Sequence, residues 1–383
     1  MGAVREPYPR FSDAEMERRR SALAMAMDVA GVEHVLVYGA NRNGSAVGWL
    51  TRWPVTREAL VVHTPGRPDA LLVNFYNHVP NATRMATEAH VCWAGAKPME
   101  TAIEELRRRG AAGRPVGLIG PLGYRPHAAL VAFAGAAVPM DAAYTRLRLV
   151  KSAEELEWLR VGAELTDAGV RALSERAGPG LDERELGNIV ERAYVGRGGT
   201  THIHYLAATP MDTPGMSVPA QWPSTRRLQR GDMLACEVSA SYWDYAGQVL
   251  RTFTVGGDPP VLYRELHDAA EAALDGILAR LRPGATAADV VEASAPIEDA
   301  GFTTRDDLLH GFVGGYLPPV LGSASRTLED VPEFSFEAGM TVVVQPNVVT
   351  QDERAGVQTG ELVAVTADGV ERLHAVEPGL LRV

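Results

Sequence analysis

Apolar runs and helix-like repeats alternate along the first part of the chain. Between Ser12 and Ala30, apolar residues recur at near-helical spacing behind a residue suited to cap a helix. Residues 97–110 carry a second helical pattern. Around it lie β-branched runs bounded by Gly, Pro or Asn, namely HVLVYG, ALVVHT, ALLVNF and PVGLIG. This alternation predicts a small α/β domain that ends near residue 145.

A second domain is predicted from residue 148 onward. Ser152 and Glu155 form a capping box at the start of a long helical pattern, which Gly178-Pro179-Gly180 ends. The remaining pattern predicts a second helix, strands near residues 202–207, a hairpin over 233–255, helices over 261–281 and 287–300, and closing β segments. Antiparallel strands with helices on one face make an α+β fold. We therefore expect domains at residues 1–147 and 148–383.

Composition narrows the class of protein. The chain has 383 residues, of which 46% are hydrophobic and 22% charged, as is typical of a soluble enzyme. A net charge of −11 argues against binding to nucleic acid or to an anionic membrane. Two cysteines fit a reducing cytoplasm, and the longest apolar stretch, residues 128–138, is shorter than the ~20 residues that span a bilayer. We expect a cytoplasmic protein that acts on a small molecule or peptide.

Polar side chains interrupt the apolar strands of the second domain. The segment VVVQPNVVTQDERAGVQTGELVAVT, residues 342–366, has the pattern of two strands and a turn, yet it carries Gln345, Gln358 and Glu361 among valines. Similar interruptions occur in THIHYLAATPM, MLACEVSASYWDYAGQVLRTFTVG and DDLLHGFVGGYLPP. A polar group buried without a partner costs ~1–3 kcal/mol, so several together indicate a shared polar cavity.

The positions of these residues suggest which of them face one another. Glu237 and Gln248 lie on adjacent predicted strands and can point into the same space. His202 and His204 are two residues apart on a strand and are expected to face the same way. His310 precedes a glycine-rich loop that can approach a ligand closely. The alternative interpretations are a solvated edge position for Glu237 and ordinary strand histidines.

These signatures, taken in order, resemble a known enzyme family. RGDMLACEVSASYWDYAGQVLRTFTVG, LLHGFVGG, FEAGMTVVVQPNVV and GVQTGELVAVTADGVERL are similar to the motifs of the pita-bread fold shared by methionine aminopeptidase, prolidase, aminopeptidase P and creatinase. The resemblance covers residues 12–375. It implies an α+β chain in which a pita-bread catalytic domain is preceded by a smaller α/β domain of the creatinase type.

The resemblance also assigns metal-ligand positions, and there this chain departs from the family. The family's metallopeptidases bind two divalent ions through two aspartates, one histidine and two glutamates. The corresponding residues here are Glu237, Gln248, His310, Gln345 and Gly360. Neutral amides and a glycine are poor ligands for hard divalent cations. A two-metal site is therefore not expected.

The first functional hypothesis is a metal-independent, creatinase-like enzyme that cleaves or rearranges a C–N bond in a small zwitterionic or amide substrate. A histidine passes a proton, as its ordinary pKa near ~6.5 permits, while glutamates hold positive charge. The predicted catalytic residues are His204, Glu237 and His310. The predicted substrate-binding residues are His202, Tyr245, Gln248, Tyr316, Gln345, Gln358 and Glu361.

Two other hypotheses remain open from the sequence. In the first, the three histidines His202, His204 and His310 join Glu237 around one divalent ion such as zinc or iron, as a rearranged Xaa-Pro peptidase-like site. In the second, the chain is a catalytically silent ligand-binding or scaffold homologue.

The resemblance further implies a homodimer in which the first domain of one subunit closes over the pocket of the other. The stretch NRNGSAVGWLTRW is then a candidate contributor to substrate binding. It offers Asn41, Arg42, Trp49 and Arg52. The alternative is an ordinary loop and strand of the first domain.

Overall fold

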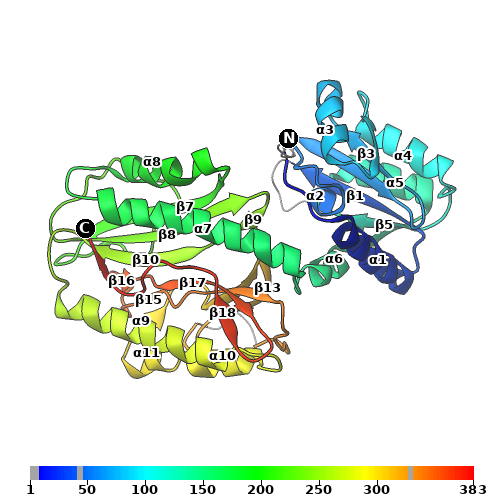
Figure 1. The fold of residues 1–383 in the computed structure, drawn as a ribbon. Coiled ribbons are helices and arrows are strands. Elements are labelled where there is room, and N and C mark those ends of the chain that lie inside the picture. Colours follow the sequence, from blue (N-terminus) through cyan, green and yellow to red (C-terminus); the bar gives the residue numbers. More distant parts are fainter. Residues whose placement is uncertain (1–7, 41–45, 327–330) are drawn as a thin grey trace, which may run out of the picture. The chain divides into compact units, whose positions relative to one another are not determined.

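A computed structural model describes residues 8–40, 46–326 and 331–383 of the chain. It divides the chain into two compact units, Met1–Arg148 and Leu149–Val383 (Figure 1). The sequence placed this boundary between residues 147 and 148. The long helix of the second unit starts a few residues beyond the boundary, at the predicted capping box.

Unit 1 is built on a mixed sheet with the strand order β4-β3-β2-β1-β5-β6. Its strands are β1 (His34–Ala40), β2 (Glu58–His63), β3 (Asp69–Val73), β4 (Ala89–Trp93), β5 (Val116–Ile119) and β6 (Ala137–Pro139). Its helices are α1 (Asp13–Ala30), α2 (Ala46–Thr51), α3 (Val79–Met85), α4 (Pro98–Arg108), α5 (Tyr124–Ala134) and α6 (Asp141–Leu147). The four apolar runs all form strands, and α1 begins after the Ser12 cap as predicted.

Unit 2 contains a larger sheet, whose main path runs β13-β12-β14-β17-β10-β8-β7. The strands of this unit are β7 (Thr200–Pro210), β8 (Asp232–Tyr242), β9 (Tyr245–Ala246), β10 (Val249–Thr254), β11 (Thr303–Thr304), β12 (Leu309–Phe312), β13 (Tyr316–Leu321), β14 (Thr341–Val344), β15 (Val348–Val349), β16 (Gly356–Val357), β17 (Gly360–Val365), β18 (Val370–Arg372) and β19 (Leu381–Arg382). The strand pairs along the main path are antiparallel.

The helices of unit 2 are α7 (Ala153–Arg176), α8 (Glu183–Tyr194), α9 (Val261–Arg280), α10 (Ala287–Ala293) and α11 (Pro296–Asp299). The capping box of Ser152 and Glu155 is present at the start of α7. The helix predicted over residues 287–300 is instead two helices. Pro296 explains the break, because proline lacks the N–H that a continuous helix needs and suits the first turn of a new one.

Helices cover both faces of the sheet at β8, where the sequence predicted helices on one face only. Leu234 and Cys236 belong to an apolar cluster with residues of α7 and α8. Met233 and Ala235 belong to a cluster with residues of α9. Successive strand residues point to opposite faces, and Figure 1 shows α7 and α8 on one side of the strands and α9 on the other. By the same alternation, Glu237 lies on the face of Ala235.

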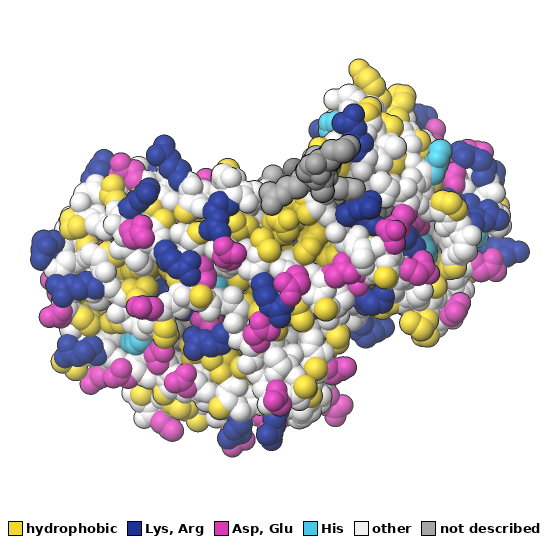
Figure 2. All heavy atoms as spheres, viewed as in Figure 1, with side chains coloured by type: hydrophobic (Ala, Val, Ile, Leu, Met, Phe, Trp, Pro, Cys, Tyr) yellow, Lys and Arg dark blue, Asp and Glu magenta, His cyan; other side chains and the backbone are white. Residues whose placement is uncertain are grey.

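The molecular surface carries both signs of charge. Figure 2 shows Lys and Arg side chains interspersed with Asp and Glu over the face in view. A nucleic-acid interface would require basic residues gathered on one surface. Across the described ranges, none of the helices has the length and apolar character needed to cross a bilayer.

A close backbone contact joins α7 to the β8–β10 hairpin. A Cβ added to Gly162 on α7 would lie 2.5 Å from Tyr245 O and 3.0 Å from Gly247 N. Gly247 shows the same constraint from the hairpin, because its Cβ would lie 2.6 Å from the Ala163 Cα. The two glycines therefore let the helix backbone rest on the turn that separates β8 from β10.

We expect Gly162→Ala to destabilise unit 2 by at least about 2 kcal/mol, because the new methyl group meets backbone atoms that cannot move separately. The matched control is Gly187→Ala on α8, where nothing lies within 4 Å of the new Cβ. That change should stabilise the protein by ~0.5–1 kcal/mol through helix propensity. Urea unfolding of both variants checks the pair, and equal effects would refute the close packing.

Candidate functional site

The β8–β10 hairpin brings Glu237 and Gln248 together, as the sequence predicted. Gln248 Nε2 donates a hydrogen bond of 2.7 Å to Glu237 Oε1, and both side chains are buried. Burial, followed by the negative charge of Asp306, raises the pKa of the Glu237 carboxyl to about 8. Glu237 is therefore mainly protonated at neutral pH and can act as a proton donor.

A second set of buried polar side chains lies just before the start of β12 and just after the end of β14. Gln345 follows β14 and donates a hydrogen bond of 3.0 Å from Nε2 to Asp307 Oδ1. The Tyr316 hydroxyl donates to the same oxygen at 3.1 Å. Burial and the neighbouring Asp306 raise the pKa of the Asp307 carboxyl. Asp307 and Gln345 thus repeat the arrangement of Glu237 and Gln248, with an amide N–H directed at a buried carboxyl group.

His310 on β12 lies beside this second group. Its Nδ1 is 3.1 Å from Gly311 O, which can only accept, so Nδ1 carries the proton and Nε2 presents its lone pair. The ring stacks on Tyr316 with centroids 3.8 Å apart, and Nε2 lies 4.0 Å from Asp307 Oδ2. Burial lowers the pKa of His310 to about 4. His310 is therefore a neutral acceptor at physiological pH.

Asp306 and Asp307 were missed in the sequence analysis. They lie in the loop before β12, so no strand periodicity directs attention to them. The signal that was available is the pair of adjacent acidic residues three and four positions before His310. Asp307 is buried whereas Asp306 is exposed, and Asp306 acts on Glu237 and Asp307 through its charge.

The structure separates the two histidines of THIHY. A β-bulge between Thr201 and Ile203 adds one residue to β7, so the expectation that His202 and His204 share a face is wrong. His202 packs edge-on against Phe312, with centroids 5.8 Å apart, and Phe312 in turn contacts the His310 ring.

His204 belongs to a different network. Its Nε2 is 2.6 Å from the Tyr194 hydroxyl on α8, and the two rings meet edge to face. Burial lowers the pKa of His204. The structure thus places His202 on the side of His310, whereas the predicted catalytic His204 contacts α8.

Glu361 already has two partners within the protein. Arg251 Nη2 and Arg372 Nε donate to its carboxylate at 2.8 and 2.5 Å. Burial opposes ionisation of Glu361, but the hydrogen bonds from both arginines outweigh it and hold its pKa below the ordinary value. Glu361 was predicted to bind positive charge of a substrate. In the structure, the positive charge that it binds is that of Arg251 and Arg372.

Two other predicted substrate-binding residues also lie among protein contacts. The Tyr245 hydroxyl donates a hydrogen bond of 2.8 Å to Glu155 Oε1, and its ring packs against Trp158 of α7. Gln358 is buried, and its backbone N–H donates to Thr252 Oγ1 at 2.7 Å. Its side-chain Oε1 is buried and has no hydrogen-bond partner among the described residues.

The predicted contributors from the first domain divide into two sets. Asn41 and Arg42 lie outside the described residues. Trp49 is buried in unit 1 against Tyr144, and Arg52 forms an ion pair of 2.9 Å with Glu88. A contribution of this stretch to a neighbouring subunit's pocket stays a prediction.

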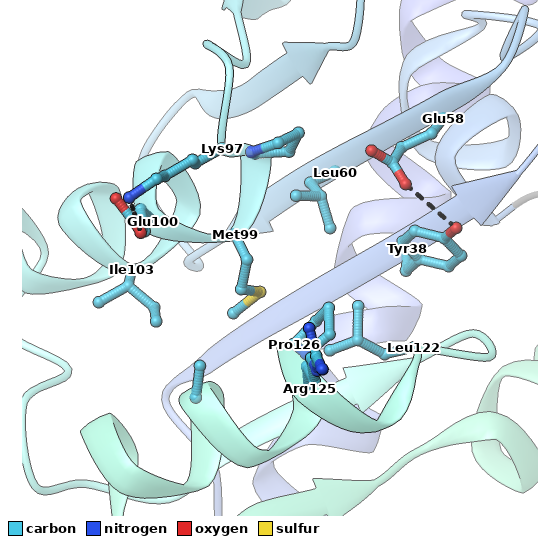
Figure 3. Close-up of a pocket in the computed structure, with 12 residues that line it drawn as sticks. Tyr38, Glu58, Leu60, Lys97, Met99, Glu100, Ile103, Leu122, Arg125 and Pro126 are labelled. Atoms are coloured by element: carbon cyan, nitrogen blue, oxygen red, sulfur yellow. Dashed lines mark hydrogen bonds and ion pairs between the residues drawn. The ribbon is translucent and has the colours of Figure 1, made fainter.

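Unit 1 also has a hollow, of about 300 Å³, between α4, α5 and the sheet (Figure 3). Its walls are mainly apolar, with Leu60, Met99 and Leu122 among the lining residues. Two of its carboxylates have partners, because the Tyr38 hydroxyl donates to Glu58 at 3.3 Å and Lys97 pairs with Glu100 at 2.7 Å. These pairings provide no set of groups arranged for catalysis.

Comparison with known proteins identifies the relatives of this chain. The model of metallopeptidase family M24 matches residues 157–367. The chain is 25% identical over 236 residues to the Xaa-Pro dipeptidase of Pyrococcus furiosus, a match that covers 61% of this chain and 66% of that relative. It is 30% identical over 162 residues to an uncharacterised hydrolase/peptidase of Sinorhizobium fredii, covering 41% and 40% respectively. The matches thus span less than two thirds of the relatives' length.

Solved structures of similar fold extend over almost the whole chain. A Xaa-Pro dipeptidase from Bacillus anthracis superposes with a TM-score of 0.82 at 20% identity, covering 96% of this chain and 100% of that one. An X-Pro aminopeptidase from Thermotoga maritima gives a TM-score of 0.79 at 15% identity, covering 94% and 100%. These structures confirm the predicted α+β class, with a pita-bread domain that follows a smaller α/β domain.

The residues that the resemblance assigns to the metal-ligand positions have side chains that do not suit a pair of divalent ions. Gln248 and Gln345 direct amide N–H groups at the two buried carboxyl groups, where a cation would need bare oxygens. A Cβ added to Gly360 would lie 2.2 Å from Val344 O, so no side chain fits there. Within the described part of the chain, no three His, Cys, Asp or Glu side chains are placed to hold a metal ion.

We expect Glu361→Gln to destabilise the protein by ~3–5 kcal/mol, because it leaves Arg251 buried without its carboxylate. The control is Glu371→Gln on the adjacent strand β18, which removes a partly exposed pair with Arg160 and should cost at most about 1 kcal/mol. Chemical denaturation measures both changes. Similar losses in the two variants would contradict the central role of the Arg251 ion pair.

The pKa of Glu237 predicts a pH dependence of stability. A carboxyl whose pKa rises on folding contributes stability that is complete below its unfolded value and is lost as pH rises toward about 8. Glu237→Gln should remove this loss. The free energy of unfolding of the variant, relative to that of wild type, should therefore rise by about 2–4 kcal/mol from pH 5 to pH 8.5. His310 and Asp307 are common to both proteins and cancel in the comparison. Parallel stability curves would show that Glu237 titrates normally.

Proposed function

The chain belongs to metallopeptidase family M24, and we propose that it is a hydrolase that cleaves an amide-type C–N bond in a small, peptide-like substrate. The similarity to Xaa-Pro dipeptidases and to an X-Pro aminopeptidase supports this substrate class. The buried set of carboxyl, amide and imidazole groups in unit 2 supports a reactive site at the position where the family binds metal.

The observation that supports the mechanism is that Gln248 and Gln345 direct amide N–H groups at buried carboxyl groups, at positions that the resemblance assigns to metal-binding carboxylates. Gln248 and Gln345 each donate to a buried carboxyl group, which fills the positions that ligands to a divalent ion would use. We therefore propose that hydrolysis proceeds without a two-metal centre. The charge stabilisation would come instead from preorganised hydrogen-bonding groups.

Acid and base roles follow from the environments of the residues. In this proposal the neutral His310 accepts a proton on Nε2 from the attacking water, whose oxygen bonds to the carbonyl carbon. Protonated Glu237 gives its proton to the departing nitrogen as the C–N bond breaks. Burial keeps His310 unprotonated and Glu237 protonated at neutral pH, which supports this division of roles.

The resemblance to creatinase leaves a second substrate class within the same proposal, namely compounds with a guanidino C–N bond. Both classes require the same proton transfers, so the site residues do not choose between them. In the homodimer that the resemblance implies, unit 1 of one subunit would cover the site of the other. Residues of that unit would then contribute to the selection between peptide-like and guanidino substrates.

We expect hydrolysis of Xaa-Pro dipeptides or of creatine-like compounds to persist after dialysis against EDTA, with less than about 0.1 metal ion per chain by elemental analysis. His310→Ala should lower kcat/KM at least about 100-fold. His204→Ala is the control, because this partly buried histidine contacts Tyr194 of α8, and its kcat/KM should change by less than about fivefold.

Three other outcomes would each have a clear meaning. Loss of activity with EDTA, together with near-stoichiometric metal, would favour a peptidase with a rearranged metal site. A larger effect of His204→Ala than of His310→Ala would assign the role of base to His204. A ligand that raises the unfolding temperature but is recovered unchanged would favour a silent binding protein.

A further inference from the structure

The hollow in unit 1 combines aliphatic walls with a small number of charged side chains. Leu60 of β2 is buried at its base, and Met99, Ile103 and Leu122 are half-buried around it. Its volume of about 300 Å³ lies at the lower end of the range for small-molecule sites. Because such sites usually have apolar walls and a few polar groups, the hollow is suited to a small ligand.

The strands of unit 1 create this hollow at one edge of the sheet. It lies at the carboxyl ends of β1 and β5, which pair in parallel. Glu58 begins the antiparallel strand β2 at the same edge, opposite Ala40 of β1. Gly120 follows β5 with a φ of +102°, and a Cβ there would lie 2.3 Å from Tyr38 O, so the chain turns tightly against β1 before α5. The carboxyl edge of parallel strands is a common place for ligands in α/β folds.

Arg125 provides positive charge at the hollow. It lies in the first turn of α5, and its exposed side chain makes no hydrogen bond or ion pair with another described residue. The other basic side chain of the hollow, Lys97, pairs with Glu100 at 2.7 Å. A guanidinium group can donate two parallel hydrogen bonds to one carboxylate. The guanidinium of Arg125 therefore favours a ligand that carries a carboxylate.

Glu58 provides the complementary negative charge. Its carboxylate accepts hydrogen bonds from Asn74 Nδ2 at 3.2 Å and from the Tyr38 hydroxyl at 3.3 Å, and both donors are uncharged. Burial, followed by the charge of Glu58, raises the pKa of Tyr38, so its hydroxyl remains a donor at neutral pH. Figure 3 shows Glu58 and Arg125 on different sides of the hollow. A half-buried carboxylate that receives only uncharged donors favours a ligand with an ammonium group.

We propose that this hollow binds a free aliphatic amino acid, with its carboxylate on Arg125, its ammonium group on Glu58 and its side chain between the apolar walls. Among the described residues, two basic and two acidic side chains line the hollow, so their charges cancel. A ligand with a single charge would match either Arg125 or Glu58, whereas a zwitterion matches both. This site goes beyond the proposed hydrolase activity and does not rest on it.

The test compares L-leucine with three analogues by isothermal titration calorimetry of the full chain. 4-Methylpentanoate lacks the ammonium group, 3-methylbutylamine lacks the carboxylate, and glycine lacks the side chain. We expect L-leucine to bind with a Kd of about 0.1–1 mM and each analogue to bind at least about fivefold more weakly. The proposal would be overturned by an absence of L-leucine binding up to about 20 mM, or by an analogue that binds as tightly as L-leucine.

Two variants test the two ends of the amino acid separately. Arg125→Met removes the guanidinium and should weaken L-leucine binding at least about fivefold, but it should not weaken 3-methylbutylamine, which has no carboxylate. Glu58→Gln removes the negative charge and keeps an acceptor oxygen. It should weaken L-leucine to a similar degree without weakening 4-methylpentanoate, which has no ammonium group.

Arg107→Met is the matched control, because it removes an exposed arginine of α4 that does not line the hollow. It should leave the Kd of L-leucine within about twofold of wild type, since salt screens distant surface charges. Equal losses in Arg125→Met and Arg107→Met would indicate an effect of net charge and overturn the proposal. Circular dichroism and urea unfolding establish that each variant is folded. If Glu58→Gln does not fold, Arg125→Met retains the test, because its exposed side chain has no partner among the described residues to lose.

The variants also separate this site from the candidate site of unit 2. Binding of L-leucine that neither Arg125→Met nor Glu58→Gln changes would place the amino acid elsewhere, as expected for a product bound in unit 2, and would overturn the proposal. Binding that both variants weaken would support it, whether or not the protein hydrolyses any tested substrate. The amino acid site and the hydrolase activity can therefore fail independently.

Discussion

Arg251 makes the contact on which the arrangement of unit 2 depends. Strands β10 and β17 pair through two residue pairs, Val249 with Glu361 and Leu250 with Gly360. Arg251 reinforces this short junction, because its guanidinium donates to Gly360 O at 2.9 Å and to the Glu361 carboxylate at 2.8 Å. A buried guanidinium is stable only when its charge and donors are matched. The ion pair therefore fixes how the two strands meet.

The two halves of the candidate site take their positions from that junction. Gln248 directly precedes β10, Gln345 follows β14, and β17 is hydrogen-bonded to both strands. Leu362 N on β17 also donates to Gln248 O at 2.9 Å. A change at Glu361 would thus act on the site through the sheet, although the hydrogen bonds of the Glu361 carboxylate go to Arg251 and Arg372. Glu361, next to Gly360 on β17, therefore supports the sheet.

The amide side chains of Gln248 and Gln345 influence the chemistry that we propose for the site. Glu237 and Asp307 each receive an amide N–H, and burial raises the pKa of both carboxyl groups. His310 remains neutral for the same physical reason, since burial disfavours the charged imidazolium. The result is a site of largely uncharged acceptors and protonated acids. These protonation states support the proton transfers of the proposed mechanism.

The sequence by itself determined the features that depend on local pattern. Strand and helix positions, the Ser152 capping box and the facing of Glu237 and Gln248 across a hairpin all follow from periodicity and short-range geometry. Tertiary structure decided the rest. Because β7 contains one extra residue at the bulge, His204 contacts Tyr194 of α8. Arg251 forms an ion pair with Glu361, which lies 110 positions later in the chain. Asp307 entered the site from a loop that has no periodicity. A bulge and a long-range ion pair depend on what packs against a strand, which the order of residues along that strand does not encode.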